Sequence, residues 1–266
     1  MHHRAYFSVA GVLCLFALVS YAGASSIAFD TAGDSAYSPL ILPPIGTNGG
    51  FGWGGGWTFP TANPGQPKTV YSLSLGSSPS GNINSPATPQ GRAWSIPGTG
   101  AQPINDFAAR PFNGALSIGQ TFMVDFDLHE SLSGSDLVLT GPSQTGWEYN
   151  YFVSSNSIGH YIIQVFGGSA VDTGLPISAA GVHIEFTPID SATAQMSLTS
   201  FDPSHASASF LLNNLPVAQM EVYNGARDYP VYFNNIAITP EPLGISLIAA
   251  AGAMLLLNRP QLPARS

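Results

Sequence analysis

The sequence predicts an all-β protein, an antiparallel β-sandwich, with a terminal segment at each end that is not part of the fold. Three observations lead to this prediction. Short runs of alternating apolar and polar residues recur through the chain, Gly (29) and Pro (22) separate these runs, and no stretch between Ser25 and Thr239 has a sustained helical period. About a dozen such runs at hairpin spacing indicate two sheets packed face to face, and a jelly roll suits this length and strand number.

The clearest strand is "QTFMVDFDL". Its alternation places Phe122, Val124 and Phe126 on a buried face, with Asp125 and Asp127 on the opposite face. The run "GVHIEFTP" has the same pattern, with His183 and Glu185 on the outward face. The other expected strands are "TVYSLSL", "RAWSI", "SDLVLTG", "WEYNYFV", "HYIIQVF", "TAQMSLT", "ASASFLL", "VAQMEVY" and "PVYFNNIAI".

One domain is expected over residues 25–238. The region 46–111 is rich in turn-forming residues and begins with "TNGGFGWGGGWTFPTANPGQP" close to its start. It is expected to form long loops along one end of the sandwich, with edge strands as an open alternative.

The composition excludes several classes of protein. Charged residues make up 8% of the chain and the formal net charge is −8. A nucleic-acid partner needs a basic footprint to neutralise phosphates, and none is present. The single cysteine, Cys14, lies in the N-terminal apolar run, which leaves the body without a disulfide or a thiolate metal site.

Residues 1–24 read as a secretory signal peptide. Arg4 supplies a positive charge, an apolar run follows, and Ala22-Gly23-Ala24 is a small-residue cleavage site before Ser25. A permanent membrane helix is the alternative. The protein is therefore expected to leave the cytoplasm through the secretion machinery.

The closing segment, residues 239–266, contains Pro240, Glu241 and Pro242, an apolar run over residues 243–257, and then Arg259 and Arg265. The run is roughly 22 Å long as a helix, short for a membrane of about 30 Å. This segment resembles the PEP-CTERM sorting signal of bacterial exported proteins, although its two arginines are separated by "PQLPA". The resemblance implies a pause in the inner membrane through residues 243–257 and processing by an exosortase-type enzyme. The cell surface or extracellular matrix is then the destination. A final core strand or buried helix is the alternative.

The body resembles sandwich modules that precede such tails, in "FDTAGDSAYS", "NGGFGWGGGW", "LSIGQTF", "GVHIEFTP" and "YFNNIAI". This resemblance implies a concanavalin-like or jelly-roll fold and no particular chemistry.

Asp125, Asp127 and Glu130 have the spacing of the carboxylate strand in laminarinase-type glycosidases, which the stretch "VDFDLHES" resembles. The resemblance implies a bulged strand whose first and last carboxylates act as nucleophile and acid/base. Asp replaces Glu at the first position and is shorter by a methylene. The alternative is that Asp125 and Asp127 belong to the solvent face of an ordinary strand.

Asp30 and Asp34 are weak candidates for a structural calcium ion, with turn and capping roles as the alternative. No cofactor is otherwise indicated, because the scattered histidines form no metal motif and no nucleophile elbow or phosphate loop occurs.

Trp53 and Trp57 lie on a glycine-rich stretch and are the candidates for stacking against sugar rings. Packing at the end of the sandwich is the alternative. Together these features predict a non-enzymatic exported protein of the cell surface or matrix with weak carbohydrate binding. The competing prediction is a glycoside hydrolase that uses Asp125, Asp127 and Glu130.

Overall fold

The computed structural model describes residues 26–37, 47–58, 73–84, 91–97, 106–128, 135–142, 149–205, 207–225 and 229–240. Residues Ser26–Thr239 form one compact unit. Apart from a short 3-10 helix, η1 (Ser35–Tyr37), the regular structure of the described residues consists of strands. These strands pair into an eight-stranded and a six-stranded sheet, which confirms the all-β prediction.

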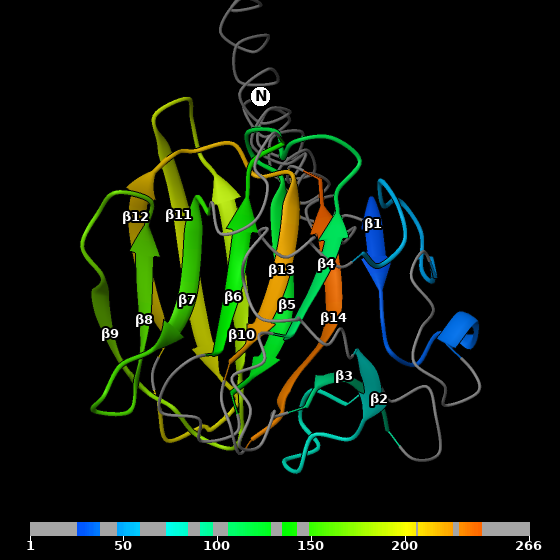
Figure 1. Cartoon of the computed structure of the whole chain (residues 1–266). Coiled ribbons are helices and arrows are strands. Elements are labelled where there is room, and N and C mark those ends of the chain that lie inside the picture. Colours follow the sequence, from blue (N-terminus) through cyan, green and yellow to red (C-terminus); the bar gives the residue numbers. More distant parts are fainter. Residues whose placement is uncertain are drawn as a thin grey trace, which may run out of the picture. The chain divides into compact units, whose positions relative to one another are not determined.

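The eight-stranded sheet has the order β12-β11-β10-β5-β14-β3-β2, and β1 also pairs with β14. Figure 1 shows this sheet at the back of the molecule. Its strands are β1 (Ala28–Asp30), β2 (Ser74–Gly76), β3 (Ala93–Ile96), β5 (Thr121–Asp127), β10 (Val182–Pro188), β11 (Thr193–Ser200), β12 (Ala208–Asn213) and β14 (Val231–Thr239).

The six-stranded sheet has the order β4-β13-β6-β7-β8-β9 and lies in front of the other in Figure 1. Its strands are β4 (Asp106–Pro111), β6 (Ser135–Thr140), β7 (Tyr151–Ser155), β8 (His160–Val165), β9 (Val171–Pro176) and β13 (Gln219–Asn224). The chain passes from one sheet to the other at β4–β5–β6 and again at β12–β13–β14. These crossings roll the strands into an antiparallel sandwich, as the sequence predicts.

The core lies between the sheets and follows from the alternation along each strand. On β5, Phe122, Val124 and Phe126 are buried, and they pack with buried side chains of both sheets, such as Ile184 of β10 and Val153 of β7. Full burial of each such side chain contributes about 1.5–3 kcal/mol. All members of this core fall within the compact unit. The unit therefore carries its own core and meets the requirement for folding alone.

The turn-rich region 46–111 contains β2, β3 and β4 as well as loops. β2 and β4 are the last strands of their sheets, which agrees with the edge-strand alternative. Residues 53–58 form bridges alongside β4, at Trp53–Phe112 and Thr58–Ala109.

The predicted signal peptide, residues 1–24, lies outside the described residues. So does the closing segment after Pro240, including Glu241, Pro242, Arg259 and the apolar run 243–257. Within the part of the chain that the structure describes, no helix has the length and apolar character to cross a membrane. The export and sorting predictions stay predictions.

Candidate functional site

The outer face of the eight-stranded sheet carries a polar cluster centred on Asp125. On one side, the Cα partner of Asp125 is His183 of β10. On the other side, its Cα partner is Asn234 of β14. Because neighbouring residues of each strand point into the core, the side chains of Asp125 and His183 share the face that points away from it. The pairing brings together residues from three strands that are far apart in the sequence.

His183 lies between two carboxylates. Its Nδ1 is 2.6 Å from Oδ1 of Asp125, and its Nε2 is 3.5 Å from Oε1 of Glu185. The hydrogen bond to Asp125 raises the pKa of His183 above its ordinary value, and burial opposes this increase. The side chain remains 30% exposed, so the imidazole and the more open Glu185 carboxylate are both accessible to a ligand.

Asn235 holds the other oxygen of Asp125. The register between β14 and β5 shifts between Asn234 and Ala237, which marks a β-bulge. Asn235 has φ 49°, the one positive φ of a non-glycine residue in the described ranges, and asparagine tolerates this region better than most residues. The bulge directs its amide so that Nδ2 donates to Oδ2 of Asp125 at 2.6 Å. Asp125 is thereby fixed from two strands.

Asp127 has a different environment from the one the sequence predicts. Like Asp125, it lies on the outward side of β5, but it is fully buried, and Ser78 Oγ donates to its Oδ2 at 2.7 Å. Neighbouring segments cover both carboxylates, so the expectation of an open solvent face is corrected.

Glu130 lies outside the described residues. The described pairs of β5 with β10 are regular, and the bulge is on β14 instead of β5.

Trp53 and Trp57 are core residues. They are 8% and 0% exposed, respectively, and the guanidinium carbon of Arg110 lies 5.4 Å from the centre of each ring. Trp57 also contacts Trp94 at a centroid distance of 5.1 Å, and its Nε1 donates to Tyr37 Oη at 3.1 Å. No face of the Trp57 ring is free for a sugar. The structure therefore supports the packing alternative instead of the stacking prediction.

Gly52 explains how the loop that contains Trp53 packs closely against the backbone just before β1. Gly52 has φ +79°, and a Cβ there would lie 2.0 Å from the carbonyl oxygen of Ile27. Only glycine permits both the left-handed conformation and this contact between backbones.

The two calcium candidates have other partners. Asp30 is fully buried, with Oδ2 3.1 Å from Nη2 of Arg110 and 2.7 Å from the hydroxyl of Tyr37. Burial raises the pKa of Asp30 to about 6 and Arg110 counteracts it, so the carboxylate is ionised at neutral pH and already paired with a cation. Asp34 accepts from the backbone N–H groups of Ala36 and Gly50, which is a turn and capping role. Within the described ranges, no group of three or more His, Cys, Asp or Glu side chains is arranged so that it could hold a metal ion.

Glu221 of β13 is a buried carboxyl group that the sequence does not single out. It lies on the outward side of the six-stranded sheet but is only 4% exposed, and its Oε1 accepts a hydrogen bond from Gln219 Nε2. Burial raises its pKa to about 7. Its strand neighbours Met220 and Val222 are core residues, so alternation alone would assign Glu221 to solvent.

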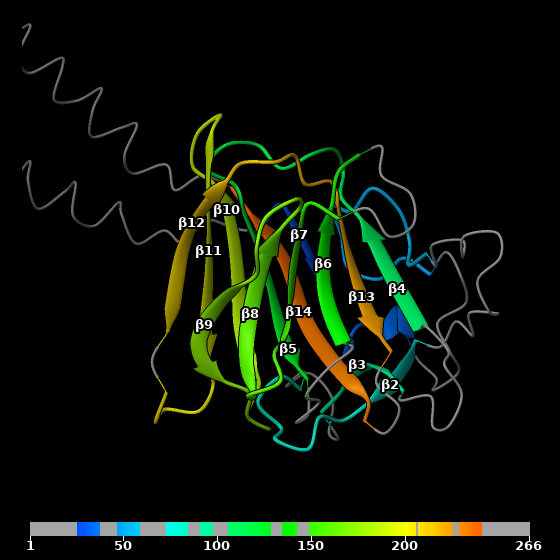
Figure 2. The same cartoon turned by 60° about the vertical axis from the view of Figure 1, so that its left-hand side comes forward.

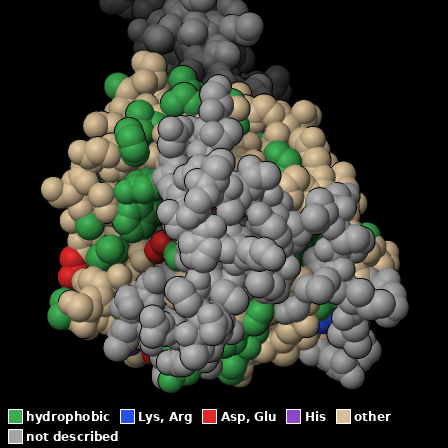
Figure 3. All heavy atoms as spheres, in the orientation of Figure 1, with side chains coloured by type: hydrophobic (Ala, Val, Ile, Leu, Met, Phe, Trp, Pro, Cys, Tyr) green, Lys and Arg blue, Asp and Glu red, His purple; other side chains and the backbone are tan. Residues whose placement is uncertain are grey.

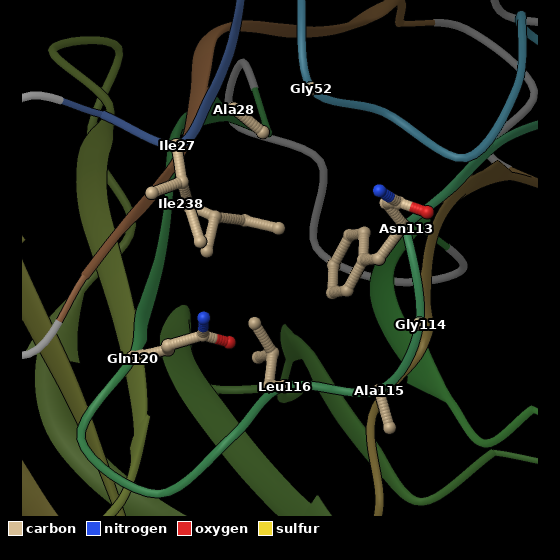
Figure 4. Close-up of a pocket in the computed structure, with 10 residues that line it drawn as sticks. Ile27, Ala28, Gly52, Asn113, Gly114, Ala115, Leu116, Gln120 and Ile238 are labelled. Carbon is tan, nitrogen blue, oxygen red and sulfur yellow. The ribbon is translucent and has the colours of Figure 1, made fainter.

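A small pocket lies where β1 and β14 meet the turn after β4. Figure 4 shows Leu116, Gln120 and Ile238 directed toward it. Its volume is about 170 Å³, below the range of roughly 300–1,000 Å³ typical of ligand pockets. Its lining combines apolar side chains with the amides of Asn113 and Gln120, and contains no ionisable side chain. Of the two places, the Asp125–His183 cluster therefore has the chemistry of a site.

Comparison with known proteins finds no matching family model and no matching curated protein. Among solved structures, the chain is similar to one described as endo-acting O-glycanases of human gut microbiota that initiate mucin breakdown, with 7% identity, TM-score 0.49, and coverage of 81% of this chain and 99% of that one. It is also similar to domain 4 of an extracellular arabinanase from Geobacillus stearothermophilus in complex with arabinotriose, with 12% identity, TM-score 0.42 and coverage of 85% and 98%. A third is the galectin LEC-6 of Caenorhabditis elegans, with 13% identity, TM-score 0.34 and coverage of 55% and 95%. At these identities and scores the similarities carry no argument about function.

Proposed function

We propose that this chain is an exported protein of the cell surface or extracellular matrix that binds polysaccharide, without hydrolysing it, on the outer face of its eight-stranded sheet. The observation that carries the proposal is the Asp125–His183–Glu185–Asn235 cluster. It presents a partly exposed imidazole, which the buried and hydrogen-bonded Asp125 positions, beside the more open carboxylate of Glu185.

This arrangement suits sugar hydroxyl groups. Each hydroxyl both donates and accepts, so it can donate to the Glu185 carboxylate and accept from the His183 ring. The hydrogen bonds to Asp125 hold the imidazole in place before a ligand arrives, which lowers the entropic cost of binding. A net charge of −8 disfavours anionic ligands. Figure 3 shows the opposite side of the molecule, that of the six-stranded sheet, where few of the coloured side chains are charged. Neutral polysaccharides are thus the ligand class that we propose.

The neighbouring rows on this face are also polar and extend the surface along the sheet. The hydroxyls of Thr121 and Thr187 are 2.8 Å apart, and Gln195 Nε2 donates to Ser209 Oγ at 2.7 Å. An extended row of hydroxyl and amide groups matches a polymer better than a single small molecule. The export part of the proposal rests on residues 1–24 and 239–266 of the sequence, with an exosortase-type enzyme as the processing partner.

The test uses residues 26–239 and a panel of neutral polysaccharides, with binding measured by calorimetry. His183→Asn removes the central group and is expected to weaken binding at least about tenfold, since a hydrogen bond to a charged group contributes roughly 1.5–3 kcal/mol. His160→Asn is the matched control, because His160 is 32% exposed and also lies 3.0 Å from an aspartate, Asp172. Equal losses in both variants, or no binding by the wild type, would contradict the proposal.

The same samples test the competing hydrolase. Release of reducing ends by the wild type, lost in Glu130→Gln on an otherwise stable protein, would replace the binding function with a glycosidase. No observation among the described residues favours this alternative, because Asp125 and Asp127 are both bonded to protein groups.

A further inference from the structure

The edges of the two sheets are protected in different ways, with one exception. An edge strand presents unpaired backbone groups, and proteins usually protect it by shortness, charge, proline, a bulge or a covering segment. β1 and β2 have three residues each. β4 is covered by residues 53–58. β9 contains Asp172 and Pro176 and a register shift opposite β8.

Among the described residues, β12 has none of these protections. It is six residues long, ends the strand order of its sheet, and pairs with no strand among the described residues except β11. Figure 2 shows it as the outermost strand on the left. Between Asp202 and Glu221 the sequence contains no Asp, Glu, Lys or Arg, and β12 itself contains no proline.

The hydrogen-bond pattern shows which groups of β12 point outward. Asn214 N donates to Ala192 O, so residues at two-residue spacing from Asn214, including Leu212 and Phe210, bond to β11. The intervening residues Ser209, Leu211 and Asn213 therefore direct their N–H and C=O groups away from the sheet. Their side chains are exposed as well, and that of Leu211 is 71% exposed.

We propose that β12 pairs antiparallel with β12 of a second copy of this chain, about a two-fold axis at Leu211. Leu211 then faces the partner's Leu211, and Ser209 faces the partner's Asn213. Three outward-facing residues per copy allow up to about six hydrogen bonds between the backbones. The two sheets join into one.

The lack of charge on β12 permits a second copy at this edge. A chain with net charge −8 repels a second copy of itself, so self-association requires a contact that adds no further repulsion. The charge-free strand β12 provides such a contact, and a two-fold contact is self-complementary by symmetry. The two Leu211 side chains cover each other, which removes a large exposed apolar group from water.

The first experiment measures the mass of residues 26–239 by sedimentation equilibrium from about 1 μM to about 1 mM. A dimer is expected, and Leu211→Lys, which places two like charges side by side, should raise its dissociation constant roughly a hundredfold. Ile158→Lys is the matched control, because Ile158 is 70% exposed and lies in the turn between β7 and β8. Thermal unfolding verifies that the variants are folded. A wild type that stays monomeric, or a Leu211→Lys dimer as tight as the wild type, overturns the proposal.

A second experiment tests the register. Cys14 is the only cysteine of the chain, so residues 26–239 contain none. Leu211→Cys should form a disulfide-linked dimer in air, because directly opposed, hydrogen-bonded residues have Cα atoms about 5.5 Å apart. Ser209→Cys alone should not, since its own copy lies roughly 14 Å away along the strand. A mixture of Ser209→Cys and Asn213→Cys proteins should cross-link. Cross-linking by Ser209→Cys alone, or none by Leu211→Cys, overturns the pairing.

Discussion

Two polar clusters in this molecule use similar residues for different ends. The Asp30–Arg110–Tyr37 cluster is buried, and its aspartate has an arginine and a tyrosine as partners. The Asp125–His183–Glu185 cluster is partly open, and its aspartate has a histidine and an asparagine as partners. In the first cluster each charge is matched within the protein. In the second, a fixed aspartate supports groups that remain accessible.

Internal pairing of every charge distinguishes the structural cluster from the binding one. Arg110 also donates to Asn48 Oδ1 and to Gly49 O, so the guanidinium joins the loop before Phe51 to the sandwich. We therefore expect changes in the buried cluster to affect folding and changes in the open cluster to affect ligand binding.

The largest expected effect is in the buried cluster. Arg110→Met leaves the Asp30 carboxylate buried without its cation, which should reduce the free energy of unfolding by about 3–5 kcal/mol. Chemical denaturation of residues 26–239 measures this loss. Changing Asp30→Leu in the same chain should recover much of it, because no unpaired charge remains. If Arg110→Met alone is as stable as the wild type, the Asp30–Arg110 ion pair does not hold the loop before Phe51 in place.

The second prediction compares a buried with an open glutamate. The pKa of Glu221 is raised to about 7 in the folded chain, above the ordinary value of 4.5 for a glutamate. The folded state thus holds this proton more tightly, so the stabilisation is complete below pH about 4.5 and is lost as the pH rises through about 7. The loss amounts to about 3 kcal/mol.

Glu221→Gln should remove this dependence and make the protein more stable than wild type at pH 8. Glu185→Gln, which changes a carboxylate that is 46% exposed, should change the free energy of unfolding at pH 8 by no more than about 1 kcal/mol. Denaturation midpoints between pH 4 and pH 8 measure both. Parallel profiles for the wild type and Glu221→Gln would contradict the assigned burial.

The smallest expected effect concerns the bulge in the open cluster. Asn235→Gly keeps the positive φ but removes the hydrogen bond to Asp125, which should cost about 1 kcal/mol. Asn235→Ala should be less stable than the glycine variant by a further 1–2 kcal/mol or so, because a Cβ without a compensating bond disfavours this conformation. Equal stability of the two variants would show that the backbone at residue 235 relaxes.

The strands that the sequence predicts best have long, regular alternation. Phe122, Val124 and Phe126 of β5 and Ile184 and Phe186 of β10 are buried as expected. β1, β4 and β9 do not appear among the expected strands. β1 has only three residues, β4 ends in Arg110 and Pro111, and β9 contains Gly174 and Pro176, so local preference is weak in all three.

The site was less predictable than the fold. Asp125 and His183 are 58 residues apart, and only the register between β5 and β10 brings them together. Alternation placed both on the outward face but could not pair them. The orientation of Trp57 depended on Trp94 and Arg110, which lie on strands that pack against it from elsewhere in the chain. Glycine content indicated close packing there without showing which way the rings point.

The position of β14 has a mechanical consequence. It is an interior strand that pairs with β1, β3 and β5, and the chain leaves the sandwich at its end, Thr239. A pulling force on the chain beyond Thr239 acts along this strand and shears its hydrogen bonds with both flanks together, instead of peeling them apart one by one. A sandwich held by its C-terminal end would thus be loaded through β14, and extraction of this strand would require its pairs with β1, β3 and β5 to break.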